Sequence, residues 1–199
     1  MRWWARSHAL PAYLVTLVAA IGLSAALGNA TFLFPSLRAG GSLGSTEFAN
    51  VLACAPVLVW LWGRQRGDGS RESVSLVPWR LFWLDALIPL ASTVLAIAVW
   101  LIAPGALSEI FARNLAASYG LAMIAFAVGA GRYAFIAPAG YLVAAMLLGF
   151  GPLSFGEPDA WAAIVAVNED EVIRLAALAV FGLGFTALFV RSTIRWALR

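Results

Sequence analysis

The sequence has few of the side chains on which most enzyme chemistry depends. Among its 199 residues there is one cysteine, Cys54, one histidine, His8, and no lysine. A lone cysteine cannot close an internal disulfide, and a lone histidine cannot supply a catalytic zinc site or paired haem ligands. A phosphate-binding G-x-x-x-x-G-K-[ST] loop is also missing, which excludes ATP hydrolysis by that motif. We therefore expect no catalytic residue, metal site or cofactor in this chain.

Charge is scarce as well. Only 12% of the residues are charged and 62% are hydrophobic, whereas soluble domains are about 25% charged and roughly 45–50% apolar. A soluble fold of this length has too little interior to bury so much apolar surface. The composition predicts an all-α polytopic membrane protein, and the length leaves room for six or seven spans of about 20 residues each.

Hydrophobic runs divide the chain into a short N-terminal interfacial segment, residues 1–10, and one transmembrane domain, residues 11–199. Six transmembrane helices are predicted at residues 11–34, 46–62, 81–103, 107–128, 133–150 and 172–190. Pro56 lies inside the second span and predicts a kink, because proline lacks the backbone N–H and clashes with the preceding turn.

The distribution of arginine predicts the orientation of these spans in the membrane. Ten of the 13 basic residues fall within residues 1–10, 63–80, 129–132 and 191–199. Arginine-rich loops stay in the cytoplasm, so both termini are predicted to be cytoplasmic. Basic residues placed at membrane edges argue against nucleic-acid binding. The bias towards Ala, Arg and Gly is typical of a GC-rich bacterium, so we expect a bacterial cytoplasmic membrane.

Two connecting segments are candidates for function. The cytoplasmic loop at residues 63–80 is a candidate docking site for a soluble partner, or only a solvated positive-inside loop; its candidate residues are Arg64, Arg66, Asp68, Arg71 and Glu72. The acidic outer loop contains Asp159, which is predicted to cap a short helix ending near residue 167. With Trp161 on its apolar side, this helix is a candidate outer gate, or a loop resting on the bilayer surface.

Polar residues inside the spans are functional candidates, because charge in hydrocarbon is costly. They are Asp85, Glu109, Arg113 and Asn114. Asp85 lies in the first turn of its helix, where an acid is favoured. Glu109 and Arg113 are four residues apart, which predicts an ion pair within the helix; a polar pathway or a contact between subunits is the alternative.

Small residues four apart predict faces where helices approach closely in lipid. The pairs are Ala116/Gly120, Ala125/Gly129, Gly140/Ala144 and Ala145/Gly149.

The six-span outline and one stretch of sequence resemble a known family. The stretch contains Ala112-Arg113-Asn114, Gly120, Arg132 and Ala137-Pro138-Ala139-Gly140-Tyr141. It is similar to small bacterial type-2 ABC exporter permeases. The resemblance implies a permease that pairs with an identical or related second permease and works with a separate ATP-binding cassette ATPase. ATP and Mg would be bound by that ATPase, and loop 63–80 would transmit its movements.

Two other functions remain open from the sequence. One is a non-transporting membrane subunit that scaffolds a larger complex. The other is a gradient-driven transporter, for which inverted repeats would be expected.

Overall fold

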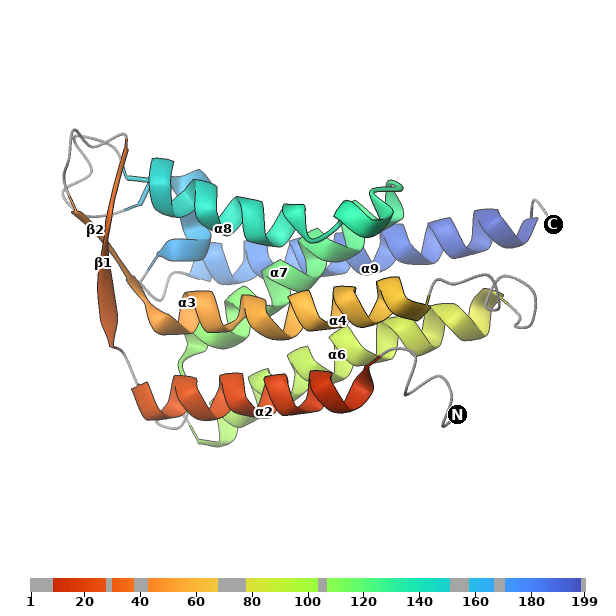
Figure 1. Ribbon diagram of the computed structural model, residues 1–199, viewed down its shortest axis with the longest axis horizontal. Coiled ribbons are helices and arrows are strands. Elements are labelled where there is room, and N and C mark those ends of the chain that lie inside the picture. Colours follow the sequence, from red (N-terminus) through yellow and green to blue (C-terminus); the bar gives the residue numbers. More distant parts are fainter. Residues whose placement is uncertain are drawn as a thin grey trace.

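The computed structural model describes residues 9–27, 30–37, 43–67, 78–103, 107–150, 158–166 and 171–197. Within these ranges the chain forms a helical bundle with a two-stranded hairpin at one end (Figure 1). The α-helices are α2 (Leu10–Leu27), α3 (Phe48–Leu52), α4 (Cys54–Gly67), α6 (Pro78–Ile102), α7 (Glu109–Ala127), α8 (Ile136–Leu148) and α9 (Glu171–Ala197). The short 3-10 helices are η1 (Gly131–Tyr133) and η2 (Ala160–Val165). Helix α2 begins and α9 ends at the end of the bundle opposite the hairpin (Figure 1).

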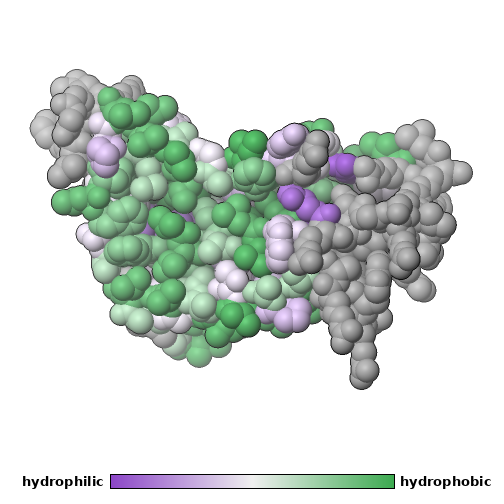
Figure 2. Space-filling view, viewed as in Figure 1, coloured by the Kyte–Doolittle hydropathy of each residue, from purple (hydrophilic) through white to green (hydrophobic). Residues whose placement is uncertain are grey.

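Among the described residues, three helices are long and apolar enough by length and composition to cross a membrane: α2, α7 and residues Glu171–Ile194 of α9. The apolar parts of α6 (Ala86–Ile102) and α8 are shorter. Large apolar side chains point outward, as Val15 of α2 shows with 70% exposure and Leu175 of α9 with 65%. Hydrophobic residues cover most of the described surface in view (Figure 2). A surface of this kind fits lipid rather than water as the surrounding solvent.

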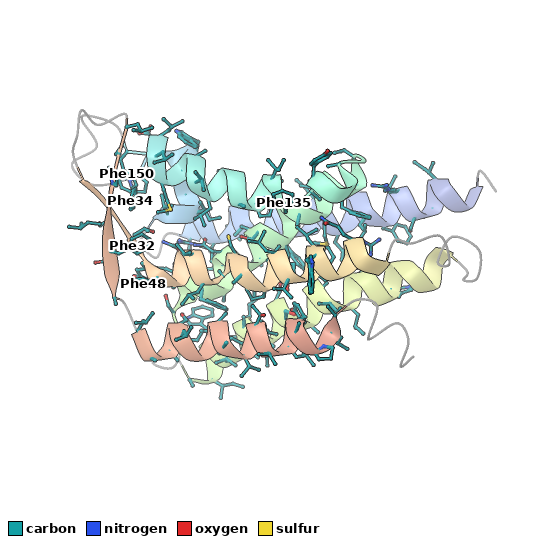
Figure 3. All side chains as sticks on the ribbon, viewed as in Figure 1. Phe32, Phe34, Phe48, Phe135 and Phe150 are labelled. Atoms are coloured by element: carbon teal, nitrogen blue, oxygen red, sulfur yellow. The ribbon has the colours of Figure 1, made fainter. Side chains whose placement is uncertain are left out.

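The hairpin was not predicted, and it shortens the first expected span. Helix α2 ends at Leu27, and residues 31–34, which were predicted as helix, belong instead to strand β1 (Thr31–Pro35). Strand β1 pairs antiparallel with β2 (Leu43–Glu47), with Thr31 opposite Glu47. Aromatic packing explains the preference for strand: the ring centroids of Phe32 and Phe48 are 4.9 Å apart. Figure 3 shows this cluster of phenylalanines at the hairpin end of the bundle.

The second expected span is a broken helix. Its first two predicted residues belong to β2, and the helix runs from Phe48 to Gly67 with an interruption at Ala53. Pro56 accounts for the interruption, since its ring clashes with the carbonyl of Leu52 four residues earlier and offers no N–H. The break lies one turn before Pro56, and the backbone angles of Ala53 at the break remain helical.

Helix α7 forms the centre of the bundle and packs against α3, α4, α6, α8 and α9. Its contact with α9 is the most extensive in the protein. Small residues make this approach possible, because a Cβ on Gly120 would lie 2.5 Å from the Val180 carbonyl oxygen. A Cβ on Gly149 would likewise lie 2.4 Å from the Ala162 Cβ of η2. Gly129 instead has open space and a φ of +98°, so it serves the turn after α7.

Candidate functional site

The buried charged and amide side chains of the described residues gather around the first half of α7. The helix begins with Ser108, whose hydroxyl accepts a hydrogen bond from the Ile110 N–H at 3.2 Å. Glu109, Arg113 and Asn114 follow, with exposures of 6%, 4% and 1%. The structure therefore brings together three of the four intramembrane candidates. Asp85 belongs to α6 by its backbone, and its side chain lies outside the described residues.

An amide network ties α7 to the hairpin side of the bundle. The Asn114 amide donates to the Asn50 side-chain carbonyl in α3 and, at 2.7 Å, to the Ile164 backbone carbonyl in η2. Asn50 in turn donates to the Thr46 hydroxyl at 2.5 Å, and Thr46 donates to the Val165 carbonyl at 3.2 Å. The buried Asn114 amide and Thr46 hydroxyl therefore donate hydrogen bonds to backbone carbonyls of residues 164 and 165. Buried polar groups in folded proteins generally have such partners.

Arg113 binds the same segment. Its Nη2 donates to the Ala166 carbonyl at 2.7 Å, and its Nε donates to the Asn114 side-chain oxygen at 3.3 Å. The carbonyls of three consecutive residues, Ile164, Val165 and Ala166, are thus held from below by side chains of α7 and β2. We define η2 together with Ala166 as the cap segment.

Glu109 is paired across helices. Its Oε1 lies 2.8 Å from the Arg174 Nε of α9, and the side chains are 7% and 35% exposed. Neither atom makes a directed hydrogen bond, so the contact is electrostatic. Arg113, the partner expected from spacing within α7, instead directs its Nη2 to the cap segment. Arg174 also lies over the Trp100 ring, 5.8 Å from its centroid, which helps to fix its position.

The cap segment corresponds to the predicted outer gate. Asp159 precedes η2 as predicted, but its side chain makes no capping hydrogen bond and the helix is 3-10 rather than α. Trp161 is 43% exposed, and its backbone carbonyl accepts a hydrogen bond from the Tyr141 hydroxyl at 2.5 Å. Ile164 and Val165 point inward with 3% and 0% exposure. The apolar side of this helix, with Ile164 and Val165, therefore packs onto the bundle.

A pocket of about 190 Å³ lies beneath the cap segment, between α7, α8 and α9. Arg113 and Asn114 supply its polar end, with the Tyr141 hydroxyl on α8 beside them. The other lining residues are apolar: Ala117, Leu121, Ala163, Ile164, Ile173, Ala176, Ala177 and Val180. The three polar side chains at this end hold the cap segment by hydrogen bonds to the carbonyls of Ala166, Ile164 and Trp161, and the space beside them is mainly apolar, as ligand pockets usually are.

The predicted docking loop falls largely on residues that the structure does not describe. Asp68, Arg71 and Glu72 lie outside the described residues, and so does the side chain of Arg66. Arg64 is described, and its guanidinium carbon lies 4.2 Å from the centre of the Phe126 ring of α7. Arg191 of α9 approaches the same ring at 4.9 Å. Residues 1–8 of the expected interfacial segment are also outside the described ranges.

Sequence reasoning missed four residues of the site: Thr46, Asn50, Tyr141 and Arg174. Asn50 carried a usable signal, because a lone amide in an apolar run must find a partner inside the protein. Arg174 is one of the three arginines on the predicted arginine-poor side, where an arginine indicates a specific partner. Among the described residues there is no group of three or more His, Cys, Asp or Glu side chains that would hold a metal ion.

Comparison with known proteins gives no relative: no protein-family model, no curated protein and no solved structure matches the chain. The function is therefore argued from the pocket and its surroundings.

Proposed function

We propose that the chain is a six-span permease subunit of a bacterial exporter, driven by a separate ATP-binding cassette ATPase. The observation that carries the proposal is the pocket between α7, α8 and α9, which is covered by the cap segment. A transport subunit needs a hollow for its substrate and a cover that can open. A subunit that only scaffolds a complex needs neither.

The proposed crossings are α2, the broken helix α3–α4, α6, α7, α8 and α9. An even number of crossings agrees with the start of α2 and the end of α9 lying at one end of the bundle (Figure 1). The arginine asymmetry assigns that end to the cytoplasm. The hairpin and the cap segment then face the outside.

The helices offer a physical route from a cytoplasmic ATPase to the cap segment. Arg64 belongs to the part of segment 63–80 that forms the end of α4, and it lies against Phe126 near the inner end of α7. Asn114, near the outer end of α7, holds the carbonyl of Ile164. A shift of α4 driven by ATP would therefore move α7, and α7 would carry the hydrogen bonds of the cap segment with it. A transport cycle requires two conformations, one with the cap segment closed and one with it open, and ATP would shift the equilibrium between them.

The test begins with a mild-detergent purification of the tagged chain from a bacterium that expresses its neighbouring genes. We expect an ATPase with a phosphate-binding loop to co-purify, and its activity to depend on this chain in lipid nanodiscs. Phe126→Leu should leave the complex intact but abolish the stimulation of ATP hydrolysis. The matched control is Phe189→Leu, an exposed aromatic residue of α9.

Two results would overturn the proposal. If only other membrane proteins co-purify and no ATPase activity is found, the chain is a scaffold subunit. If Phe126→Leu and Phe189→Leu behave alike, the route through α7 is wrong.

A further inference from the structure

We infer that the pocket beneath the cap segment binds one acyl chain of a bilayer phospholipid, which enters from the side between α8 and α9. The bound part of the lipid is hydrocarbon, and its headgroup stays outside the mouth of the pocket. The inference deepens the proposed function, and only the identity of this lipid as the transported substrate rests on that function.

The polar side chains of the pocket are already used by the protein. Arg113, Asn114 and Tyr141 donate hydrogen bonds of 2.5–2.7 Å to backbone carbonyls of the cap segment. A polar ligand that competed for these donors would leave buried carbonyls without partners, which is costly. The pocket therefore favours a ligand that forms no hydrogen bonds.

Small apolar side chains make the hollow. Ala117 of α7, Ala163 of the cap segment, and Ala176 and Ala177 of α9 all line it. Alanine ends at its Cβ, so these positions leave a space between the helices that longer side chains such as Leu121 only partly fill. An apolar hollow that stays empty loses the dispersion contacts of its lining. A hydrocarbon chain restores these contacts.

The pocket opens to the apolar outer surface of the bundle. Helices α8 and α9 both pack on α7 and make hardly any contact with each other (Figure 1). Ala176 lines the pocket and is itself exposed, so the mouth lies beside this residue. Its neighbours Leu175 and Leu178 on α9 are 65% and 43% exposed and continue the apolar surface. A lipid chain therefore passes from the bilayer into the pocket without crossing water.

The volume of the pocket fits a single chain. Sites that enclose a whole drug-sized ligand measure about 300–1,000 Å³, whereas this pocket measures about 190 Å³. Aliphatic cavities of about 150 Å³ stay dry and accept a small hydrocarbon. The pocket therefore accepts a segment of one acyl chain, while the second chain and the headgroup of the lipid remain in the bilayer.

The test is photolabelling of the full purified chain in lipid nanodiscs without ATP. Two phosphatidylcholine probes are compared, one with a diazirine in an acyl chain and one with a diazirine in the headgroup. Helix α7 is largely buried, so adducts on its residues 113–121 report a group inside the pocket, whereas α2 is mostly exposed and serves as the reference. We expect the ratio of α7 to α2 adducts to be about tenfold higher for the acyl probe, as for a chain that is bound while its headgroup is not.

Two further probes define the ligand. Phosphatidylglycerol with the same acyl diazirine should give the same ratio as phosphatidylcholine, because the headgroup makes no contact inside the pocket. An adamantane diazirine, a free hydrophobic solute without a headgroup, tests the other source of hydrocarbon. Labelling of α7 by the solute alone would assign the pocket to hydrophobic solutes instead of lipid.

Variants on two walls of the pocket supply the controls. Ala176→Phe blocks the mouth and should lower the ratio for the acyl probe by about fivefold or more, since its larger side chain occupies that space. Ala179→Phe changes an equally exposed alanine that does not line the pocket and should label like the wild type. Ala117→Leu fills the hollow from α7 and should act like Ala176→Phe. Because the two variants lie on different helices, a folding defect in one does not explain both.

The inference is overturned if the headgroup diazirine labels α7 as strongly as the acyl diazirine, or if the two headgroups give different ratios. It is also overturned if Ala176→Phe and Ala179→Phe label alike. Because this assay needs no ATPase, it separates the two proposals. A labelled pocket without a coupled ATPase would leave the lipid site and remove the transport function. A coupled ATPase with an unlabelled pocket would remove only the lipid site.

Discussion

Gly120 of α7 and Gly184 of α9 meet backbone to backbone, since a Cβ on Gly184 would lie 2.5 Å from the Gly120 carbonyl oxygen. This approach lets α9 supply Arg174 to Glu109 and a wall to the pocket. We expect Gly184→Ala to destabilise the protein by about 1–3 kcal/mol, the usual cost of overpacking. Gly182→Ala is the matched control, because nothing lies within 4 Å of its position. Thermal unfolding in detergent measures both; equal melting temperatures would show that the glycines do not set the spacing.

The Glu109–Arg174 pair should show coupling in a double-mutant cycle with Glu109→Gln and Arg174→Gln. We expect a coupling energy of about 0.5–3 kcal/mol, as for residues in direct contact. Arg174→Gln should be the more damaging single change, because it leaves a carboxylate of 7% exposure without its cation, whereas Arg174 is 35% exposed. Glu171→Gln, an exposed acid of the same helix, is the control. Additive effects of the two changes would mean that the contact contributes nothing.

Asn114→Leu should loosen the cap segment. The change removes donors from the Asn50 side chain and from the Ile164 carbonyl, at a cost of about 1–3 kcal/mol for the buried groups left unpaired. Hydrogen exchange of residues 160–166 should become faster, while α2 should exchange as in the wild type. Thr16→Val is the control, since the Thr16 hydroxyl bonds only to the Ala12 carbonyl of its own helix. Unchanged exchange in the cap segment would show that other contacts hold it.

Tyr13 should matter more than Tyr119 in the second buried polar cluster. The Tyr13 hydroxyl contacts both the Ser92 hydroxyl and, at 2.7 Å, the Tyr119 hydroxyl. Tyr119→Phe leaves the bond between Tyr13 and Ser92 in place, so it should cost about 0.5–1.5 kcal/mol. Tyr13→Phe removes both bonds and should cost more. Chemical unfolding of the two variants gives the order, and the reverse order would contradict this arrangement.

The positions of the helices could be predicted from the sequence, because apolar runs long enough to span a bilayer are characteristic of transmembrane helices. Each of the six predicted spans overlaps a helix of the structure. Among the described residues, three helices are long and apolar enough to cross a membrane. The hairpin was missed because the apolar residues 32–34 were taken as a continuation of the run of α2, although Gly28 and Asn29 interrupt that run. Strand pairing with residues 43–47 depends on contacts with a separate segment of the chain, which a local pattern does not contain.

The site was half predictable. Glu109, Arg113 and Asn114 were singled out because polar groups in an apolar span must be satisfied by something. Their partners were not found, since Ile164, Ala166 and Arg174 are 50 or more residues away in sequence and two of them act through the backbone. Every residue has a backbone carbonyl, so the sequence does not show which carbonyl will accept a hydrogen bond.

The central position of α7 also bears on how the chain is made. Of the three long helices, α7 is the least apolar, and its polar groups find partners on both sides of the sequence. Asn50 leaves the ribosome before Asn114, but Ala166 and Arg174 leave it more than 50 residues after the groups that they satisfy. In the proposed topology, helix α7 therefore enters the membrane with part of its polar surface unmatched, and these polar groups gain their partners only after the cap segment and the start of α9 have been synthesised.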